Sequence, residues 1–146
     1  MPDGSEDERT LVGETITDQT ATPVSPQERS LQLALAAART ACQNRGPDIV
    51  LLDMREQTPL FDYFVLATGT SRRQLHAMSE EIDHTLEDDL NDRRMSIEGY
   101  NESRWILLDY GSVVIHLFDE ETREYYALEQ LWSGARRIPY PVGESL

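Results

Sequence analysis

The stretch W-I-L-L-D-Y-G-S-V-V-I-H-L-F, from Trp105 to Phe118, contains two apolar runs rich in β-branched residues. They flank the dipeptide Gly111-Ser112. Glycine at the first of two loop positions is typical of a type II′ hairpin turn, because glycine alone takes a positive φ there without strain. We therefore predict that the two runs are antiparallel strands joined by this turn.

Such a turn sets the register of the hairpin, because side chains alternate between the two faces of a strand pair. One face is uniformly apolar and is predicted to lie in the core; it pairs Tyr110 with Val113, Leu108 with Ile115 and Ile106 with Leu117. The other face pairs Trp105 with Phe118, Leu107 with His116 and Asp109 with Val114. This mixture is typical of a half-exposed contact surface. It also fits a sheet face that is covered by a helix of the same chain, and the pattern leaves both readings open.

The composition limits the class of partner. The chain has 146 residues, a length typical of one domain, and a net charge of −14 with arginine as its only basic residue besides histidine. Nucleic-acid binding needs a clustered cationic face, so we expect no DNA binding and little direct contact with RNA. The single cysteine, Cys42, excludes a disulfide framework. No membrane span or signal peptide is evident, so we expect a soluble cytoplasmic protein that binds no membrane.

Three segments are predicted along the chain. Residues 1–24 hold six acidic residues and one arginine but no aromatic residue, which is typical of a disordered acidic tail. Residues 25–134 form the folded domain. Residues 135–146 contain two prolines and are expected to be a loose C-terminal tail.

The pattern of apolar residues predicts that the domain has an α/β fold with a single mixed sheet of about five strands and flanking helices. Ser25 and Ser71 each begin a helix with a capping box, and Asp119 begins a third helix whose buried face is Tyr125, Leu128 and Trp132. The predicted strands are residues 48–54, 62–68 and 95–100 and the two strands of the hairpin; the run D-Y-F-V-L-A-T fits a central strand buried on both faces.

The turn A-T-G-T-S around Gly69, between a buried strand and a helix, could bind an anion on helix N–H groups. A nucleotidyltransferase would use such a turn together with paired carboxylates for Mg²⁺. No predicted strand carries such a pair, and Asp53, Glu98 and Asp109 lie on different strands. A nucleotide-binding or nucleotidyl-transferring enzyme is therefore the alternative function. The other reading is that Gly69 only permits a tight turn.

His76, Glu80 and His84 share one side of the second helix, but two full turns separate the outer pair, so a solvated helix face is expected instead of a metal site. No nucleophile or catalytic set is recognisable around His116. We therefore predict no catalytic residue, no cofactor and no metal, and the chain is not expected to be an enzyme.

Four sequence blocks resemble the ribosomal silencing factor family, RsfS, also called Iojap-like. They are D-Y-F-V-L-A-T-G-T-S-R-R-Q, E-G-Y, the hairpin stretch and R-E-Y-Y-A-L-E-Q-L-W, in this order, and they span roughly residues 26–133. The acidic tail and the lack of lysine are not part of the family pattern.

The resemblance implies a nucleotidyltransferase-like topology without enzymatic activity. It also implies binding to large-subunit ribosomal protein L-fourteen, which blocks joining of the small and large subunits and represses translation. Trp105 matches the tryptophan of the family, so the resemblance assigns partner binding to it. Leu107, Asp109 and Glu98 are added from strand alternation and proximity. Whether the protein forms a homodimer stays open.

Overall fold

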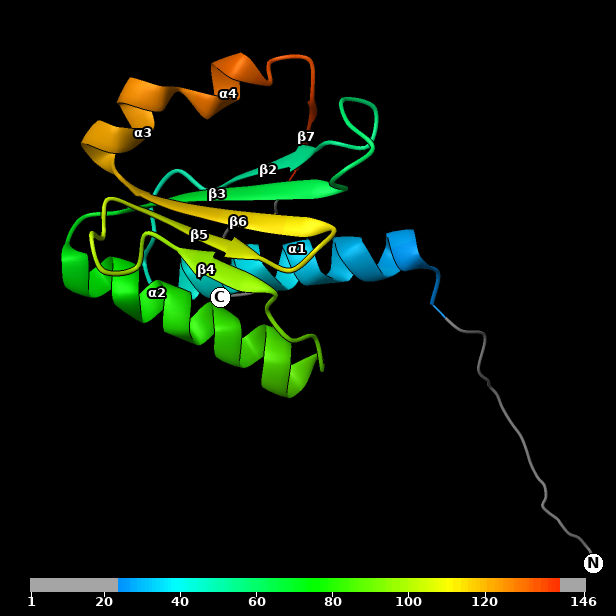
Figure 1. The fold of residues 1–146 in the computed structure, drawn as a ribbon, viewed down its shortest axis with the longest axis horizontal. Coiled ribbons are helices and arrows are strands. Elements are labelled where there is room, and N and C mark those ends of the chain that lie inside the picture. The colour runs from blue at the N-terminus through cyan, green and yellow to red at the C-terminus, as the bar shows by residue number, and fades with distance from the viewer. Residues whose placement is uncertain (1–23, 140–146) are drawn as a thin grey trace, which may run out of the picture.

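The computed structural model describes residues 24–139, which form one six-stranded mixed sheet with helices on both faces (Figure 1). The order of strands is β4-β5-β6-β3-β2-β7. Only β3 and β6 pair in parallel. The strands are β2 (Val50–Asp53), β3 (Tyr63–Gly69), β4 (Ser96–Glu98), β5 (Trp105–Asp109), β6 (Val113–Asp119) and β7 (Arg136–Ile138).

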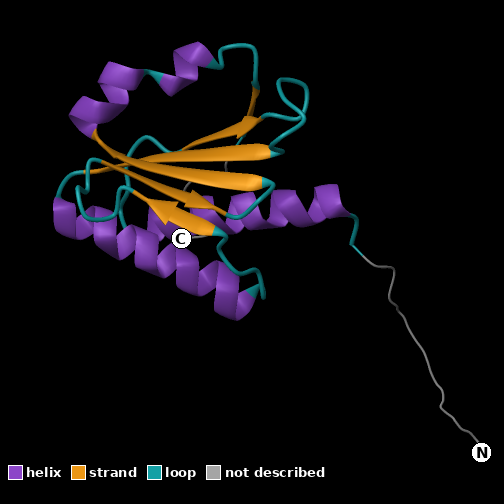
Figure 2. Ribbon diagram, viewed as in Figure 1, coloured by secondary structure: helices purple, strands orange, loops and turns teal. Residues whose placement is uncertain are grey.

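Two long helices cover one face of the sheet. They are α1 (Pro26–Gln43) and α2 (Arg72–His84), and a π-helical segment, η1 (Thr85–Asp89), continues α2. The shorter helices α3 (Glu120–Tyr126) and α4 (Leu128–Leu131) lie across the opposite face (Figure 2). The larger apolar cluster lies under α1 and α2, where Leu75, Met78 and Ile82 of α2 meet the sheet. The sheet is therefore the middle layer of three.

The hairpin has the predicted register. Trp105 pairs with Phe118 and Leu108 with Ile115, and the N–H of Tyr110 donates to the carbonyl of Val113 at 2.9 Å. Gly111 has a φ of 93°, a conformation that only glycine adopts cheaply. The predicted core face is buried under α1 and α2, so the faces of the hairpin are assigned as the alternation requires.

The central strand is β3, which is buried along its whole length. It lies between β2 and β6, as the continuous apolar run predicts. At the start of α1, Ser25 and Glu28 form the predicted capping box. At α2 only half of the box forms: the Ser71 hydroxyl accepts the N–H of Gln74 at 3.0 Å, but the Gln74 side chain accepts the N–H of Thr70 instead.

Two expectations from the sequence are wrong. The sheet has six strands and not about five, because residues 136–138 of the expected loose tail form β7 and pair with β2. The third helix is broken at Ala127, whose φ of 47° is left-handed, and Tyr125 is 80% exposed and not buried. Residues 1–23 and 140–146, which make up most of the two expected tails, lie outside the described residues.

Candidate partner-binding face

The four candidate residues lie together on one face of the sheet. Trp105, Leu107 and Asp109 alternate along β5 and therefore point to the same side. Glu98 of the edge strand β4 pairs with Leu107, so it shares that side. The three residues of β5 are half-buried and Glu98 is exposed. We call this set the β4–β5 face.

Helices of the chain cover only part of this side of the sheet. Leu128 and Trp132, from α4 and its end, pack on a small apolar cluster centred on Phe64, Leu66 and Phe118 of β3 and β6. Trp105 and Leu107 contact that cluster from its border. On this face the inner strands are therefore covered by the chain, as one reading of the sequence expected, while the residues of β5 stay half-buried. The reading as a contact surface stays a prediction.

One hydrogen bond and two ring contacts hold Trp105 at this border. Its indole N–H donates to Nδ1 of His116 at 3.1 Å, and its ring lies 5.0 Å from that of Phe118 and 4.9 Å from that of Tyr126. Burial lowers the pKa of His116 to about 3, so the imidazole is neutral near pH 7 and can accept this bond. Because Nδ1 accepts, the proton of the neutral ring is on Nε2.

Asp109 has a second task in the hairpin. Its carboxylate accepts the N–H of Gly111 at 2.8 Å, which closes an Asx-type turn next to the loop. The carboxylate of Asp109 is half-buried, and its hydrogen bond to the turn stabilises the hairpin. The residue therefore contributes to folding as well as to the charge of the β4–β5 face.

A pocket of about 490 Å³ opens beside Trp105, between α3 and the loop that joins β4 to β5. The sequence did not point to it, because the period of the third helix placed Tyr125 in the core. Neither glycine nor proline marks the break at Ala127 that turns Tyr125 outward. Its lining is Gly99, Glu102, Arg104, Trp105, Glu121, Thr122, Tyr125 and Tyr126.

The Gly69 turn lies where the parallel strands β3 and β6 end and where α2 and α3 leave for opposite faces of the sheet. Such switch points often bind ligands in α/β folds. A Cβ on Gly69 would lie 2.6 Å from side-chain carbons of Leu75, so close packing explains the glycine. The three carboxylates do not converge here: Asp53 is on β2, while Glu98 and Asp109 are on β4 and β5, across the central strands.

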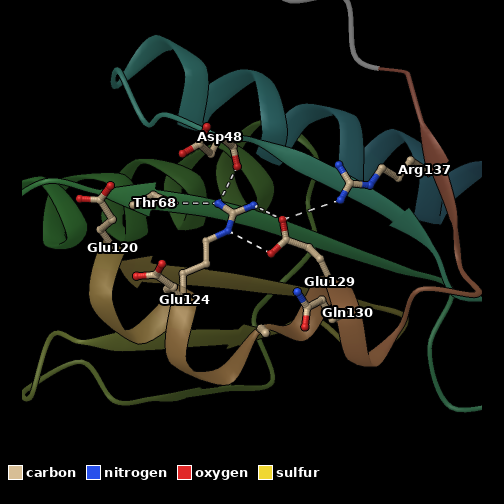
Figure 3. A pocket seen from close by; sticks show the side chains of 9 residues that line it. Asp48, Thr68, Glu120, Glu124, Glu129, Gln130 and Arg137 are labelled. Carbon is tan, nitrogen blue, oxygen red and sulfur yellow. Dashed lines mark hydrogen bonds and ion pairs between the residues drawn. The ribbon is translucent and has the colours of Figure 1, made fainter.

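The crevice at this switch point has a volume of about 470 Å³, and Asp48, Thr68 and Glu129 are among its lining residues (Figure 3). The buried side chain of Arg123 also lines it. Its guanidinium donates to the carbonyl of Asp48 at 2.6 Å, to the hydroxyl of Thr68 at 2.8 Å and to Glu129 at 2.8 Å. Hydrogen bonding to Arg123 lowers the pKa of the Glu129 carboxyl. The arginine therefore ties α3 and α4 to the sheet.

The histidines of α2 do not converge on a metal site. His76 stacks on Tyr100 with ring centroids 4.1 Å apart and hydrogen-bonds Ser103, Glu80 accepts the Tyr100 hydroxyl, and His84 pairs with Asp88. Within residues 24–139, no group of three or more potential ligands could hold a metal ion. No helix in the same range is long and apolar enough to cross a membrane.

The relatives found by comparison with known proteins include ribosomal silencing factors. The chain is 41% identical over 103 residues to ribosomal silencing factor RsfS of Bacillus subtilis (strain 168). This alignment covers 69% of this chain and 86% of that protein. It is 39% identical over 93 residues to the protein named "Mitochondrial assembly of ribosomal large subunit protein 1" of Mus musculus. This alignment covers 62% of this chain and 41% of that protein.

A crystal structure of a protein from Chromobacterium violaceum has the same fold, with a TM-score of 0.68 at 31% identity, over 78% of this chain and 93% of that one. The family model described as "Ribosomal silencing factor during starvation" matches residues 27–145. This match covers the sheet, its helices and the β4–β5 face, and so the chain belongs to the ribosomal silencing factor (RsfS) family.

Proposed function

We propose that this chain binds the large ribosomal subunit through ribosomal protein L-fourteen, blocks joining of the small subunit sterically and so represses translation. It acts without an active site. The contact is made by the β4–β5 face, with Trp105 as its anchor. The observation that carries the proposal is the half-buried indole of Trp105, which His116 fixes at the border of the covered part of the sheet.

Charge favours a protein as the direct contact. The chain carries a net charge of −14, and the β4–β5 face adds the carboxylates of Glu98 and Asp109 around its apolar residues. An acidic surface is repelled by rRNA phosphates but is attracted to a basic ribosomal protein. Interfaces of this kind combine an aromatic anchor with a charged rim.

The alternative, a nucleotide-binding or nucleotidyl-transferring enzyme, has less support. The Gly69 turn is explained by the approach of Leu75, and the carboxylate of Asp53 is already bound by Arg55 and Arg136. Equilibrium binding of ATP, GTP or CTP with Mg²⁺ tests it directly. We expect no saturable binding at millimolar nucleotide.

Sedimentation tests the proposed function. Lysate is separated on a sucrose gradient at low salt, and we expect the protein in the fraction of free large subunits and not with small subunits or translating ribosomes. Purified subunits are then mixed with the protein before Mg²⁺ is raised, and the fraction of joined ribosomes should fall. Trp105→Ala is the matched control and should restore joining. Protein found only at the top of the gradient would contradict the proposal.

A further inference from the structure

We propose that the pocket beside Trp105 receives one basic side chain, an arginine or a lysine, of the protein partner. We call this site the aromatic pocket and define it by Trp105, Tyr125, Tyr126, Glu102 and Glu121. The proposal rests on the function proposed above and deepens it, because it names the chemistry that the partner must present. It also extends the contact from the sheet to α3.

The walls of the aromatic pocket are three rings at different angles. The Trp105 and Tyr126 rings lie 4.9 Å apart at 49°, and those of Tyr125 and Tyr126 lie 5.0 Å apart at 85°. All three residues line the pocket, so their rings give it an aromatic wall. A cation over the face of an aromatic ring is attracted by the ring quadrupole, and the aliphatic stem of a basic side chain packs on apolar surface.

The exposure of the two tyrosines needs an explanation. Tyr125 is 80% exposed and Tyr126 is 53% exposed, although both belong to a helix that packs on the sheet. The left-handed conformation of Ala127 breaks that helix, so that Leu128 and Trp132 reach the apolar cluster while Tyr125 stays outside. Adjacent exposed aromatic side chains beside a pocket are typical of a binding surface.

The rim of the aromatic pocket carries charge of one predominant sign. Glu102 lies on the loop between β4 and β5, and Glu121 lies in the first turn of α3; both are exposed. Arg104 also lines the pocket, and within residues 24–139 none of these three side chains forms an ion pair. Two carboxylates and one guanidinium leave one negative charge, which a single basic side chain neutralises.

The position of the aromatic pocket fits the same partner. Trp105 belongs both to the pocket and to the β4–β5 face, so one bound protein can cover the two without a gap. A partner that is basic enough to be attracted by the acidic chain supplies arginine or lysine at its surface. Arginine suits the site well, because its planar guanidinium stacks on aromatic rings and bonds carboxylates.

The test measures the affinity of full-length variants for purified ribosomal protein L-fourteen of the same species by calorimetry at low salt. Glu121→Gln and Tyr125→Leu should each weaken binding about three- to tenfold, the range for loss of one cation contact. Tyr125→Phe keeps the ring and should stay within about twofold of wild type. Thermal melts of each variant check that the fold is intact.

Matched controls lie on the same helix. Glu120 and Glu124 belong to α3 but line the crevice around Arg123 (Figure 3) and not the aromatic pocket. Glu120→Gln and Glu124→Gln remove the same charge from the same element with the same change in shape. They should stay within about twofold of wild type, which separates a local contact from the general effect of net charge.

The sign of the effect identifies the occupant. If a basic side chain fills the pocket, Arg104→Gln should leave affinity unchanged or raise it. If an acidic side chain fills it, Arg104→Gln should weaken binding and Glu121→Gln should strengthen it, and that result overturns the proposal. Equal affinities for Glu121→Gln, Tyr125→Leu and Glu124→Gln overturn it as well, while wild-type binding leaves the proposed function intact. Failure of the wild type to bind either L-fourteen or large subunits overturns both.

Discussion

The two faces of the β5–β6 hairpin differ although the same two strands build them. On one face Ile106, Leu108, Ile115 and Leu117 are fully buried. The long helices α1 and α2 cover them, so these residues expose no surface that a partner could contact. On the other face the cover is the short, broken pair α3 and α4, and the residues of β5 stay half-buried. The first face stabilises the fold, and we infer that the second divides its residues between folding and binding.

The largest expected effect tests the covered face. Ile115→Ala should lower the free energy of unfolding by roughly 2–5 kcal/mol, because it removes apolar carbons from a fully buried site and leaves a cavity. Chemical denaturation measures this change. Affinity for L-fourteen, measured where the variant is still folded, should not change. A harmless Ile115→Ala would mean that the core does not depend on this face.

The corresponding change on the other face is Trp105→Ala. We expect a loss of about 2 kcal/mol or more in binding, as for an interface anchor, with a smaller loss in stability. Some stability is lost because the indole packs on Phe118 and donates a hydrogen bond to Nδ1 of His116. The same denaturation and affinity measurements apply. If affinity and fold are both retained, the contact surface lies elsewhere on the molecule.

His116, on the mixed face, makes stability depend on pH. Its pKa is about 3 in the folded protein, lowered by burial from 6.5. Between these values the unfolded chain binds a proton that the folded chain does not, so stability should fall as pH drops from about 6.5 towards 3, by at most about 1.4 kcal/mol per pH unit from this group. His116→Asn places an amide oxygen near the position of Nδ1, where it can accept the N–H of Trp105, but it cannot titrate. Denaturation across this range should show a shallower pH dependence for the variant; equal slopes would mean that other groups dominate.

Much of the fold follows from local sequence patterns. Gly111 and the alternation around it set the hairpin register, and the apolar run of β3 predicts its central place. These patterns are strong because a one-residue slip would bury polar groups. The strand β7 could not be predicted from its local sequence. It has three residues, and its contacts include an ion pair between Arg136 and Asp53, 83 positions apart, which no local pattern reveals.

The candidate site was only partly predictable for a related reason. Strand alternation places Trp105, Leu107 and Asp109 on one side, and pairing brings Glu98 beside them. Tyr125 of α3 was misplaced because a helical period assumes an unbroken helix. Ala127 takes a left-handed conformation, but alanine is not a residue type that predicts this conformation from sequence. Tertiary packing of Leu128 and Trp132 overrides the local preference there.

The smallest effects separate the two tasks of Asp109. Asp109→Asn keeps an oxygen that can accept the N–H of Gly111 but removes the charge, so stability should change by less than about 0.5 kcal/mol. Affinity for L-fourteen should fall by about 0.5–1 kcal/mol, with a weaker dependence on salt, as for a charge at the rim of an interface. Asp109→Ala also removes the turn bond and should cost about 1 kcal/mol of stability in addition. If the two variants unfold alike, the hydrogen bond to Gly111 contributes nothing. If they bind like wild type, the charge of Asp109 faces no basic partner, and the β4–β5 face ends at Leu107.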